Sequence, residues 1–121
     1  IRIPQACDLT DTINWYRTAF HELGHWTGHK TRLDRSLTTK FGTVDYAREE
    51  LVAEMATAFV CASLGIVPTV RHADYIGSWL QVLKEDAKAI VRAASLASKA
   101  SDVILAFRSE QPSSHDLEQA A

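Results

Sequence analysis

The segment HELGH at residues 21–25 constrains the fold of this 121-residue chain more than any other feature. Apolar side chains recur around it at steps of three and four residues, which predicts a helix from about Thr12 to a cap at Gly28. The side chains on that face are Ile13, Tyr16, Phe20, Leu23 and Trp26. Histidines four positions apart in a helix lie one turn apart on the same face, so both imidazoles can reach a single metal ion.

The same segment therefore predicts a catalytic zinc site. We expect His21 and His25 to bind Zn²⁺ at about 2.0–2.1 Å, with Glu22 as the general base that takes a proton from water. The alternative is that the histidines and Glu22 only stabilise the helix surface through contacts one turn apart. The helical context of the motif favours the metal site.

A zinc site of this kind needs a third protein ligand. The candidates in the sequence are His29, Asp45, Glu50, Glu54 and His72. Glu50 and Glu54 lie one turn apart on a second predicted helix, on a partly buried face where two carboxylates repel unless a cation lies between them. We predict that Glu50 binds the metal and that Glu54 accepts the remaining N–H of a zinc-bound imidazole. Glu54 as the ligand stays open.

Several nearby residues have weaker assignments. The neighbouring Glu49 is interpreted as part of an acidic, solvated face. His29, His72 and Tyr75 are candidate cleft residues, and His72 or Tyr75 can hydrogen-bond the oxyanion of a tetrahedral intermediate. Two loop arginines, Arg32 and Arg35, can clamp a carboxylate or a phosphate, although a solvated loop charge is the commoner case.

The chain as a whole is predicted to be one mainly α-helical domain. The segment 1–12 is expected to be extended and 108–121 to be a flexible polar tail, with the domain at 13–107. Further helices are expected from Thr43 or Asp45 to Gly65, from about Ala73 to Lys84 and from about Asp86 to Phe107, with a loop at 30–43. Short strands, if present, are expected only at 1–3 and 39–44.

Composition excludes several classes of protein. The formal charge is −2 and the thirteen Lys and Arg residues are scattered, so the chain lacks the basic stripe of a nucleic-acid-binding domain. No apolar run reaches the roughly 18 residues that a membrane span needs, and the N-terminus does not resemble a signal peptide. Two cysteines are too few for a disulfide framework. We expect a soluble, cytoplasmic protein.

Three stretches of the sequence resemble a known family. They are FHELGHWTGHKTRLDR at 20–35, FGTVDYAREELVAEMATAFVCASLGI at 41–66 and HADYIGSWLQVLKEDAKAIVRAASLASKASDVIL at 72–105. They are similar to the zincin-like metallopeptidase domain of plasmid and phage polyvalent proteins, which is the C-terminal domain of ArdC-type antirestriction proteins and of TraC-type plasmid primases. The resemblance covers about residues 13–107.

The resemblance implies a zincin-like helical fold and a zinc site with His21 and His25 as ligands and Glu22 as the catalytic glutamate. A glutamate of the EELVAE segment is implied as third ligand, and analogy with gluzincins favours Glu50 as ligand and Glu54 behind it. In full-length relatives a DNA-binding domain precedes this one. Zincins also hold their substrate along a strand before the HExxH helix, whereas only twenty residues precede His21 here.

Two functions remain open from the sequence. The first is a zinc-dependent metallopeptidase domain of a plasmid- or phage-type antirestriction or conjugation protein, which hydrolyses a peptide or protein substrate. The alternative is a non-catalytic module that a metal stabilises and that acts in antirestriction by binding DNA or protein. Any DNA contact is expected to come from a domain outside this chain.

Overall fold

The structure is a computed structural model that describes residues 12–35, 42–67 and 76–110, together with Ile3, Gln5 and Leu37. Its elements are the α-helices α1 (Thr12–Trp26), α2 (Val44–Leu64), α3 (Ile76–Glu85) and α4 (Ala89–Ala106), followed by the 3-10 helix η3 (Phe107–Glu110). None of the described residues forms a strand. The prediction of a mainly helical fold is thus confirmed.

The bounds of α2 follow from its two caps. Thr43 precedes the helix in an extended conformation, and its hydroxyl accepts a hydrogen bond from the backbone N–H of Tyr46 at 3.2 Å. At the other end Gly65 has a φ of 70°, a left-handed conformation that glycine adopts without a steric penalty. Both caps agree with the sequence prediction.

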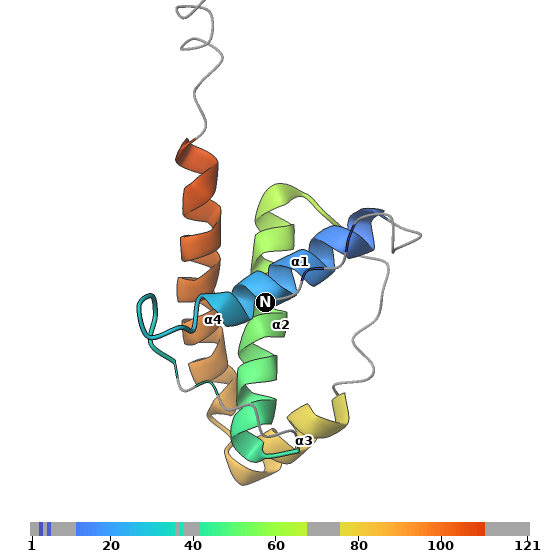
Figure 1. Ribbon diagram of the computed structural model, residues 1–121. Helices are drawn as coiled ribbons and strands as arrows, with labels where there is room; N and C mark the ends of the chain where they lie inside the picture. The colour runs from blue at the N-terminus through green and yellow to red at the C-terminus, as the bar shows by residue number, and fades with distance from the viewer. Residues whose placement is uncertain are drawn as a thin grey trace, which may run out of the picture.

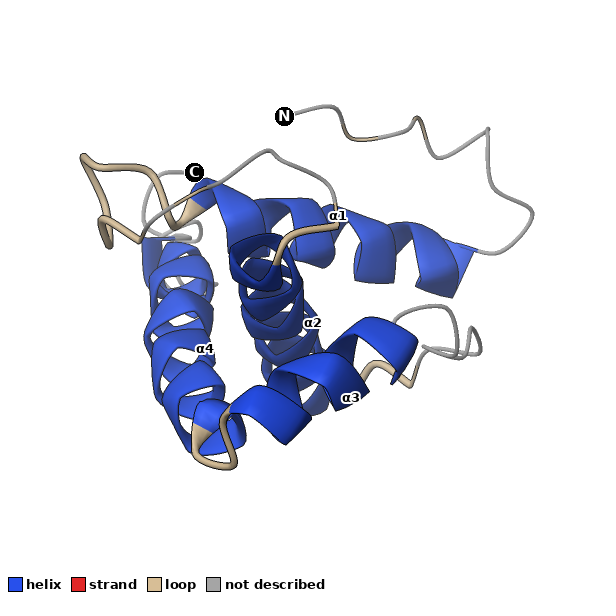
Figure 2. Ribbon diagram, turned by 90° about the horizontal axis from the view of Figure 1, so that it is seen from below, coloured by secondary structure: helices blue, strands red, loops and turns tan. Residues whose placement is uncertain are grey.

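Helix α2 is the centre of the fold, and α1, α3 and α4 all pack against it (Figure 1). Helix α4 runs alongside α2, whereas α1 crosses over α2 at a steep angle (Figure 2). Because α2 is covered from several sides, it is buried around most of its circumference and not along one stripe.

Small side chains make the contact between α2 and α4 close. Alanines of α4 recur at steps of three or four residues and are buried against apolar side chains of α2; together the two sets are Leu51, Val52, Ala56, Ala93, Ala97 and Ala100. A second cluster of Ala47, Val82 and Ala89 joins α3 to the other two helices. The small residues let the two backbones approach, which brings α4 against the central helix.

Two further expectations concern the boundaries of the domain and its relation to a membrane. No described helix is both long and apolar enough to span a bilayer. Apart from Ile3, Gln5 and Thr12, the segment 1–12 lies outside the described residues, as do residues 111–121 of the tail. The domain boundaries stay a prediction.

The α2–α4 contact predicts a large difference between two neighbouring substitutions. Ala97 is fully buried, whereas Ser98 is exposed. We expect Ala97→Leu to lower the free energy of unfolding by about 1–3 kcal/mol, because the added carbons force the helices apart. Ser98→Leu should change it by less than about 0.5 kcal/mol. Urea unfolding of both variants measures this, and equal effects would contradict the proposed packing.

Candidate metal centre

A glycine of α1 lies against α2 where the two helices cross. A Cβ atom placed on Gly24 would lie 3.2 Å from the Cα atom and 3.4 Å from the carbonyl oxygen of Ala53. These distances are tighter than ordinary van der Waals contact, so glycine lets the two backbones approach closely without a displacement. The crossing therefore lays the HELGH face of α1 directly on the EELVAE face of α2.

Three side chains that the sequence predicts as metal ligands meet at this crossing. The Nε2 atoms of His21 and His25 lie 3.1 Å apart. The carboxylate of Glu50 faces both of them, with Oε2 at 3.4 Å from His21 Nε2 and Oε1 at 3.0 Å from His25 Nε2. One ligand atom from each residue lies within 4.8 Å of the other two.

These separations fit a small divalent cation. Two ligands that bind a tetrahedral zinc ion at about 2.0–2.1 Å lie about 3.3–3.4 Å from each other, close to the observed values. Two imidazoles and one carboxylate are also a donor set that zinc accepts. The residues present therefore suit a metal ion between α1 and α2.

The other ring nitrogen of each histidine lies beside a second carboxylate. His21 Nδ1 lies 2.8 Å from Glu54 Oε1, and His25 Nδ1 lies 3.2 Å from Glu49 Oε1. The interpretation of Glu49 as a solvated residue was wrong, because its exposed fraction is 8%. Since α2 is central in the fold, the face that carries Glu49 is covered as well as the face that carries Glu50.

An arginine supports each of these outer carboxylates. Arg17 Nη2 donates to both oxygens of Glu54 at 3.1 Å. Arg35 donates from Nε to Glu49 Oε2 at 3.0 Å and from Nη2 to Glu49 Oε1 at 2.7 Å. The clamping role that the sequence left open for Arg35 is thus filled by a carboxylate of the same chain, whereas Arg32 stacks on the Trp26 ring at 3.8 Å.

Electrostatics favour a cation at the centre. With neutral histidines, the three carboxylates exceed the two guanidinium groups by one negative charge. Burial lowers the pKa of both histidines, but hydrogen bonds outweigh burial and raise each pKa to about 9: those of His21 go to Glu50 and Glu54, and those of His25 to Glu49 and Glu50. Burial raises the pKa of Glu50, and hydrogen bonds from the two histidines outweigh it and lower the pKa to about 2.

Glu22 differs from Glu49, Glu50 and Glu54 in its contacts. It is partly buried on α1 between the two histidines, and among the described residues it has no hydrogen bond or ion pair. Glu49, Glu50 and Glu54 are each engaged by a histidine. Glu22 is therefore the carboxylate of this group that is not committed to the protein.

The remaining candidates are not brought together with these residues in the described structure. His29 is exposed, and its Nδ1 accepts a hydrogen bond from the Thr31 backbone at 3.2 Å. Asp45 is exposed and pairs with Arg48 at 3.3 Å. His72 and Tyr75 lie outside the described residues.

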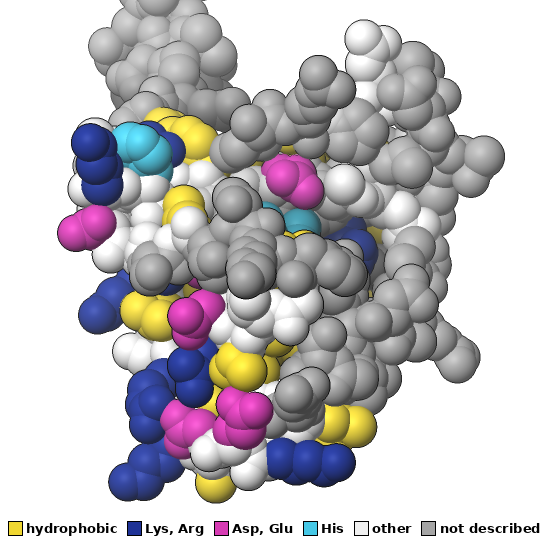
Figure 3. All heavy atoms as spheres, turned by 60° about the horizontal axis from the view of Figure 1, so that its bottom comes forward, with side chains coloured by type: hydrophobic (Ala, Val, Ile, Leu, Met, Phe, Trp, Pro, Cys, Tyr) yellow, Lys and Arg dark blue, Asp and Glu magenta, His cyan; other side chains and the backbone are white. Residues whose placement is uncertain are grey.

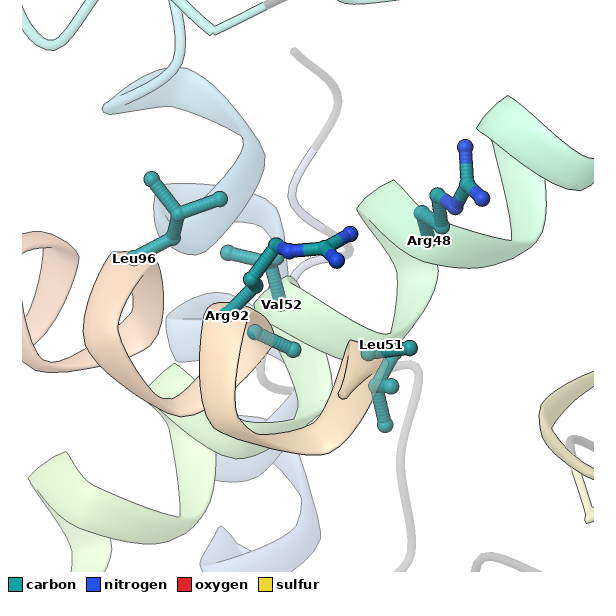
Figure 4. A pocket seen from close by; sticks show the side chains of 7 residues that line it. Arg48, Leu51, Val52, Arg92 and Leu96 are labelled. Carbon is teal, nitrogen blue, oxygen red and sulfur yellow. The ribbon is translucent and has the colours of Figure 1, made fainter. Parts of the chain in front are cut away.

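A separate hollow lies between α2 and α4 (Figure 4). It is lined by Arg48, Leu51, Val52, Ala89, Arg92, Ala93 and Leu96. Arg92 pairs with Asp86 and Arg48 with Asp45, so both arginines of this hollow already have acidic partners. Among the described residues, acidic and basic side chains are interspersed over the lower part of the face shown in Figure 3.

Comparison with known proteins shows the family to which this chain belongs. The model of the zincin-like metallopeptidase family matches residues 1–96, and the chain belongs to this family. The resemblance seen in the sequence is thereby confirmed.

Segments of longer proteins are similar to this chain. A DNA primase TraC of Escherichia coli is 46% identical over 121 residues, which cover 99% of this chain and 11% of the primase. A second DNA primase TraC of Escherichia coli is 45% identical over 112 residues, or 92% of this chain and 8% of that protein. The protein y4eC of Sinorhizobium fredii is 39% identical over 91% of this chain and 36% of its own length. This chain thus spans a small part of these relatives.

Solved structures show the same fold. The antirestriction protein ArdC from plasmid R388, in its Mn(II)-bound structure, superposes with a TM-score of 0.77 at 38% identity over 91% of this chain and 42% of that one. Its metal-free structure gives a TM-score of 0.67 at 44% identity over 82% of this chain and 36% of that one. The helical architecture of this chain is therefore shared with the matching part of ArdC.

The close crossing generates a first prediction at this site. Gly→Ala at an exposed helix position stabilises a protein by about 1 kcal/mol. At Gly24 we expect the opposite, a loss of about 1–2 kcal/mol, because the new methyl group meets backbone atoms of Ala53 that cannot turn away. Urea unfolding measures the change, and Ala58→Gly at an exposed position of α2 calibrates the helix propensity. A gain in stability of Gly24→Ala would contradict the close contact between Gly24 and the backbone of Ala53.

The pKa values of the cluster predict how the stability of the metal-free protein depends on pH. The raised pKa values of His21 and His25 stabilise the fold fully below about pH 6.5, and this stability is lost as pH rises through about 9. The lowered pKa of Glu50 stabilises it above about 4.5, and this is lost as pH falls through about 2. Stability should therefore be highest between about pH 4.5 and 6.5.

Urea unfolding in the presence of a chelator measures this profile. Between pH 6.5 and 9.5 we expect a loss on the order of a few kcal/mol. A variant with both His21→Gln and His25→Gln serves as the control, because the loss over this range should be much smaller without the imidazoles. A wild-type profile that stays as flat as that of the variant would contradict the arrangement.

Proposed function

We propose that this chain is a zinc-dependent peptidase domain, in which His21, His25 and Glu50 hold the metal and Glu22 acts as general base. The distances among the three ligands and membership of the zincin-like metallopeptidase family support this assignment. Similarity to TraC and ArdC supports a role in a plasmid- or phage-type antirestriction or conjugation protein of the cytoplasm. Contacts with DNA would be made by other parts of such a protein.

The free carboxylate of Glu22 is the observation that carries the catalytic assignment. A general base needs a carboxylate that can accept a proton from water, and a carboxylate fixed by an arginine or a histidine is poorly suited to this. Glu49, Glu50 and Glu54 are fixed in this way. Glu22 has no such partner among the described residues and lies next to His21 in the helix.

The division of work follows from these positions. A bound zinc ion supplies Lewis acidity, which makes water a better nucleophile and polarises a peptide carbonyl. Glu22 takes a proton from the attacking water and can pass it to the leaving amine. Glu54 and Glu49 hold the two imidazoles through Nδ1, so that both Nε2 atoms face the centre.

The chemistry of the donor set favours zinc. Two imidazoles and one carboxylate form the His₂Glu set of catalytic zinc sites. The related ArdC structure contains Mn(II), and nitrogen and oxygen ligands of this kind also bind manganese and cobalt, with the outcome set by geometry and metal supply. Metal analysis of the protein as purified from its host distinguishes these ions.

A second candidate function is a metal-stabilised module without catalysis. None of the described residues forms a strand, whereas a zincin-type peptidase uses an edge strand to hold an extended substrate. In this case the metal would join α1 to α2, and the domain would act in antirestriction by binding protein or DNA. A chelator would then lower the stability strongly while no peptide is hydrolysed.

Glu22→Gln separates the two functions. The amide keeps the size of the side chain but cannot accept the proton, so we expect zinc content to be unchanged and hydrolysis to fall at least about 100-fold. Zinc is measured by elemental analysis, and cleavage by mass spectrometry of a peptide library incubated with the zinc-loaded protein. Cleavage by Glu22→Gln at the wild-type rate would rule out its role as base.

The double variant His21→Ala and His25→Ala is the matched control. It should bind no zinc and cleave no peptide. If the wild type binds about one equivalent of zinc that this variant lacks, yet cleaves nothing in the library, the non-catalytic module is favoured. If neither protein binds zinc, both functions are wrong.

A further inference from the structure

The loop after α1 folds back on the end of that helix. The backbone N–H of Leu33 donates to the carbonyl of Thr27 at 3.0 Å, and the N–H of Arg35 donates to that of Gly28 at 3.0 Å. Between them Asp34 has a φ of 48°, a left-handed conformation that reverses the chain. The loop thus returns Arg35 to the place where α1 crosses α2.

The guanidinium group of Arg35 connects three parts of the chain there. The side chain of Arg35 is buried, with an exposed fraction of 5%. Besides its two hydrogen bonds to Glu49 on α2, it donates from Nη2 to the carbonyl of Gly24 at 2.7 Å and from Nη1 to the hydroxyl of Thr27 at 2.9 Å. A buried arginine with this many partners has a fixed position.

Gly28 leaves the space that this guanidinium group occupies. A Cβ atom at Gly28 would lie 2.7 Å from Leu37 Cδ2, 2.9 Å from Arg35 Nη2 and 3.1 Å from Arg35 Cζ. A methyl group there would displace the ends of the Leu37 and Arg35 side chains, and so disturb the contact of the guanidinium group with Glu49 while Arg35 itself remains in the sequence. The missing side chain of Gly28 therefore helps to define where the guanidinium group of Arg35 lies.

We propose that Arg35 is a positioning residue for the metal centre: by fixing Glu49 it holds the His25 ring with Nε2 directed at Glu50 and His21. The inference rests on the proposed function, because it assigns a role at the same metal. Glu49 Oε1 is shared between Arg35 Nη2 at 2.7 Å and His25 Nδ1 at 3.2 Å. Losing the guanidinium group frees Glu49 and, with it, the ring of His25.

The opposite side of the centre offers a matched comparison. Arg17 holds Glu54, and Glu54 lies beside Nδ1 of His21. Arg17 donates to its carboxylate from Nη2, and Arg35 donates to Glu49 from two nitrogens in a fork and also binds the end of α1. Removal of each arginine should therefore disturb a different histidine.

Proton NMR of the histidine rings tests this without any activity measurement. In wild type a hydrogen-bonded Nδ1 proton of His25 should be protected from exchange and visible at low field, in metal-free and in zinc-loaded protein. We expect Arg35→Gln to broaden or shift the His25 signal and to leave that of His21 in place. Arg17→Gln should do the reverse. Arg48→Gln, an exposed arginine on α2, is the control and should change neither.

Zinc affinity provides the second measurement. Loss of a group that orients a ligand weakens metal binding by about 10–100-fold. We expect an increase of this size in the zinc dissociation constant of Arg35→Gln, measured by competition with a chromophoric chelator. Gly28→Ala should weaken binding in the same direction although every polar side chain is retained. Arg35→Lys keeps the charge without the fork and should recover only part of the affinity.

Each outcome has a distinct meaning. The inference is overturned if Arg35→Gln and Gly28→Ala leave the His25 proton and the zinc affinity as in wild type, or if Arg35→Gln disturbs both rings equally. If circular dichroism shows that Arg35→Gln is unfolded, Gly28→Ala decides by the same criteria. If wild type binds no zinc, the proposed function fails, and the selective loss of the His25 signal still tests the role of Arg35 in holding that ring.

Discussion

The close crossing of α1 over α2 at Gly24 and Ala53 is the contact on which the rest of the structure depends. It brings a histidine pair from one helix within about 3 Å of a carboxylate on the other. A methyl group at the crossing would meet the backbone of Ala53 and push the two helices apart by a few tenths of an ångström, which would disturb the distances between these side chains. The glycine inside the HELGH segment is therefore as much a part of the centre as its histidines.

The crossing also gathers charges that are costly to bury alone. Three glutamates with exposed fractions of 8% or less lie in one interface, and each is stabilised there only because a cation or a polarised ring lies beside it. Charge alternates outward from the centre, from imidazole to carboxylate to guanidinium, on both sides. Such an arrangement is consistent with a central cation, since protons or a metal ion must balance the remaining negative charge.

The sequence predicted those parts of this arrangement that depend on one helix at a time. Helical spacing alone placed His21 and His25 on one face, and glycine and threonine marked both ends of α2. It did not place Glu49, because a residue next to Glu50 points to a different side of the helix and is buried only when further elements cover that side. The partner of Glu49 comes from a loop fourteen positions earlier, and local patterns do not contain such a contact.

Helix α1 buries only Ala19, His21 and Gly24, so it brings few apolar side chains to the core. The polar contacts of the centre must supply much of what holds it against α2. In terms of native-state fluctuations, opening of α1 should then cost less free energy when the cation is missing, and its amide hydrogens should exchange faster than with the cation bound. A bound cation would stabilise the state in which α1 is packed on α2. The concentration of the cation in the cell would therefore determine how often α1 opens.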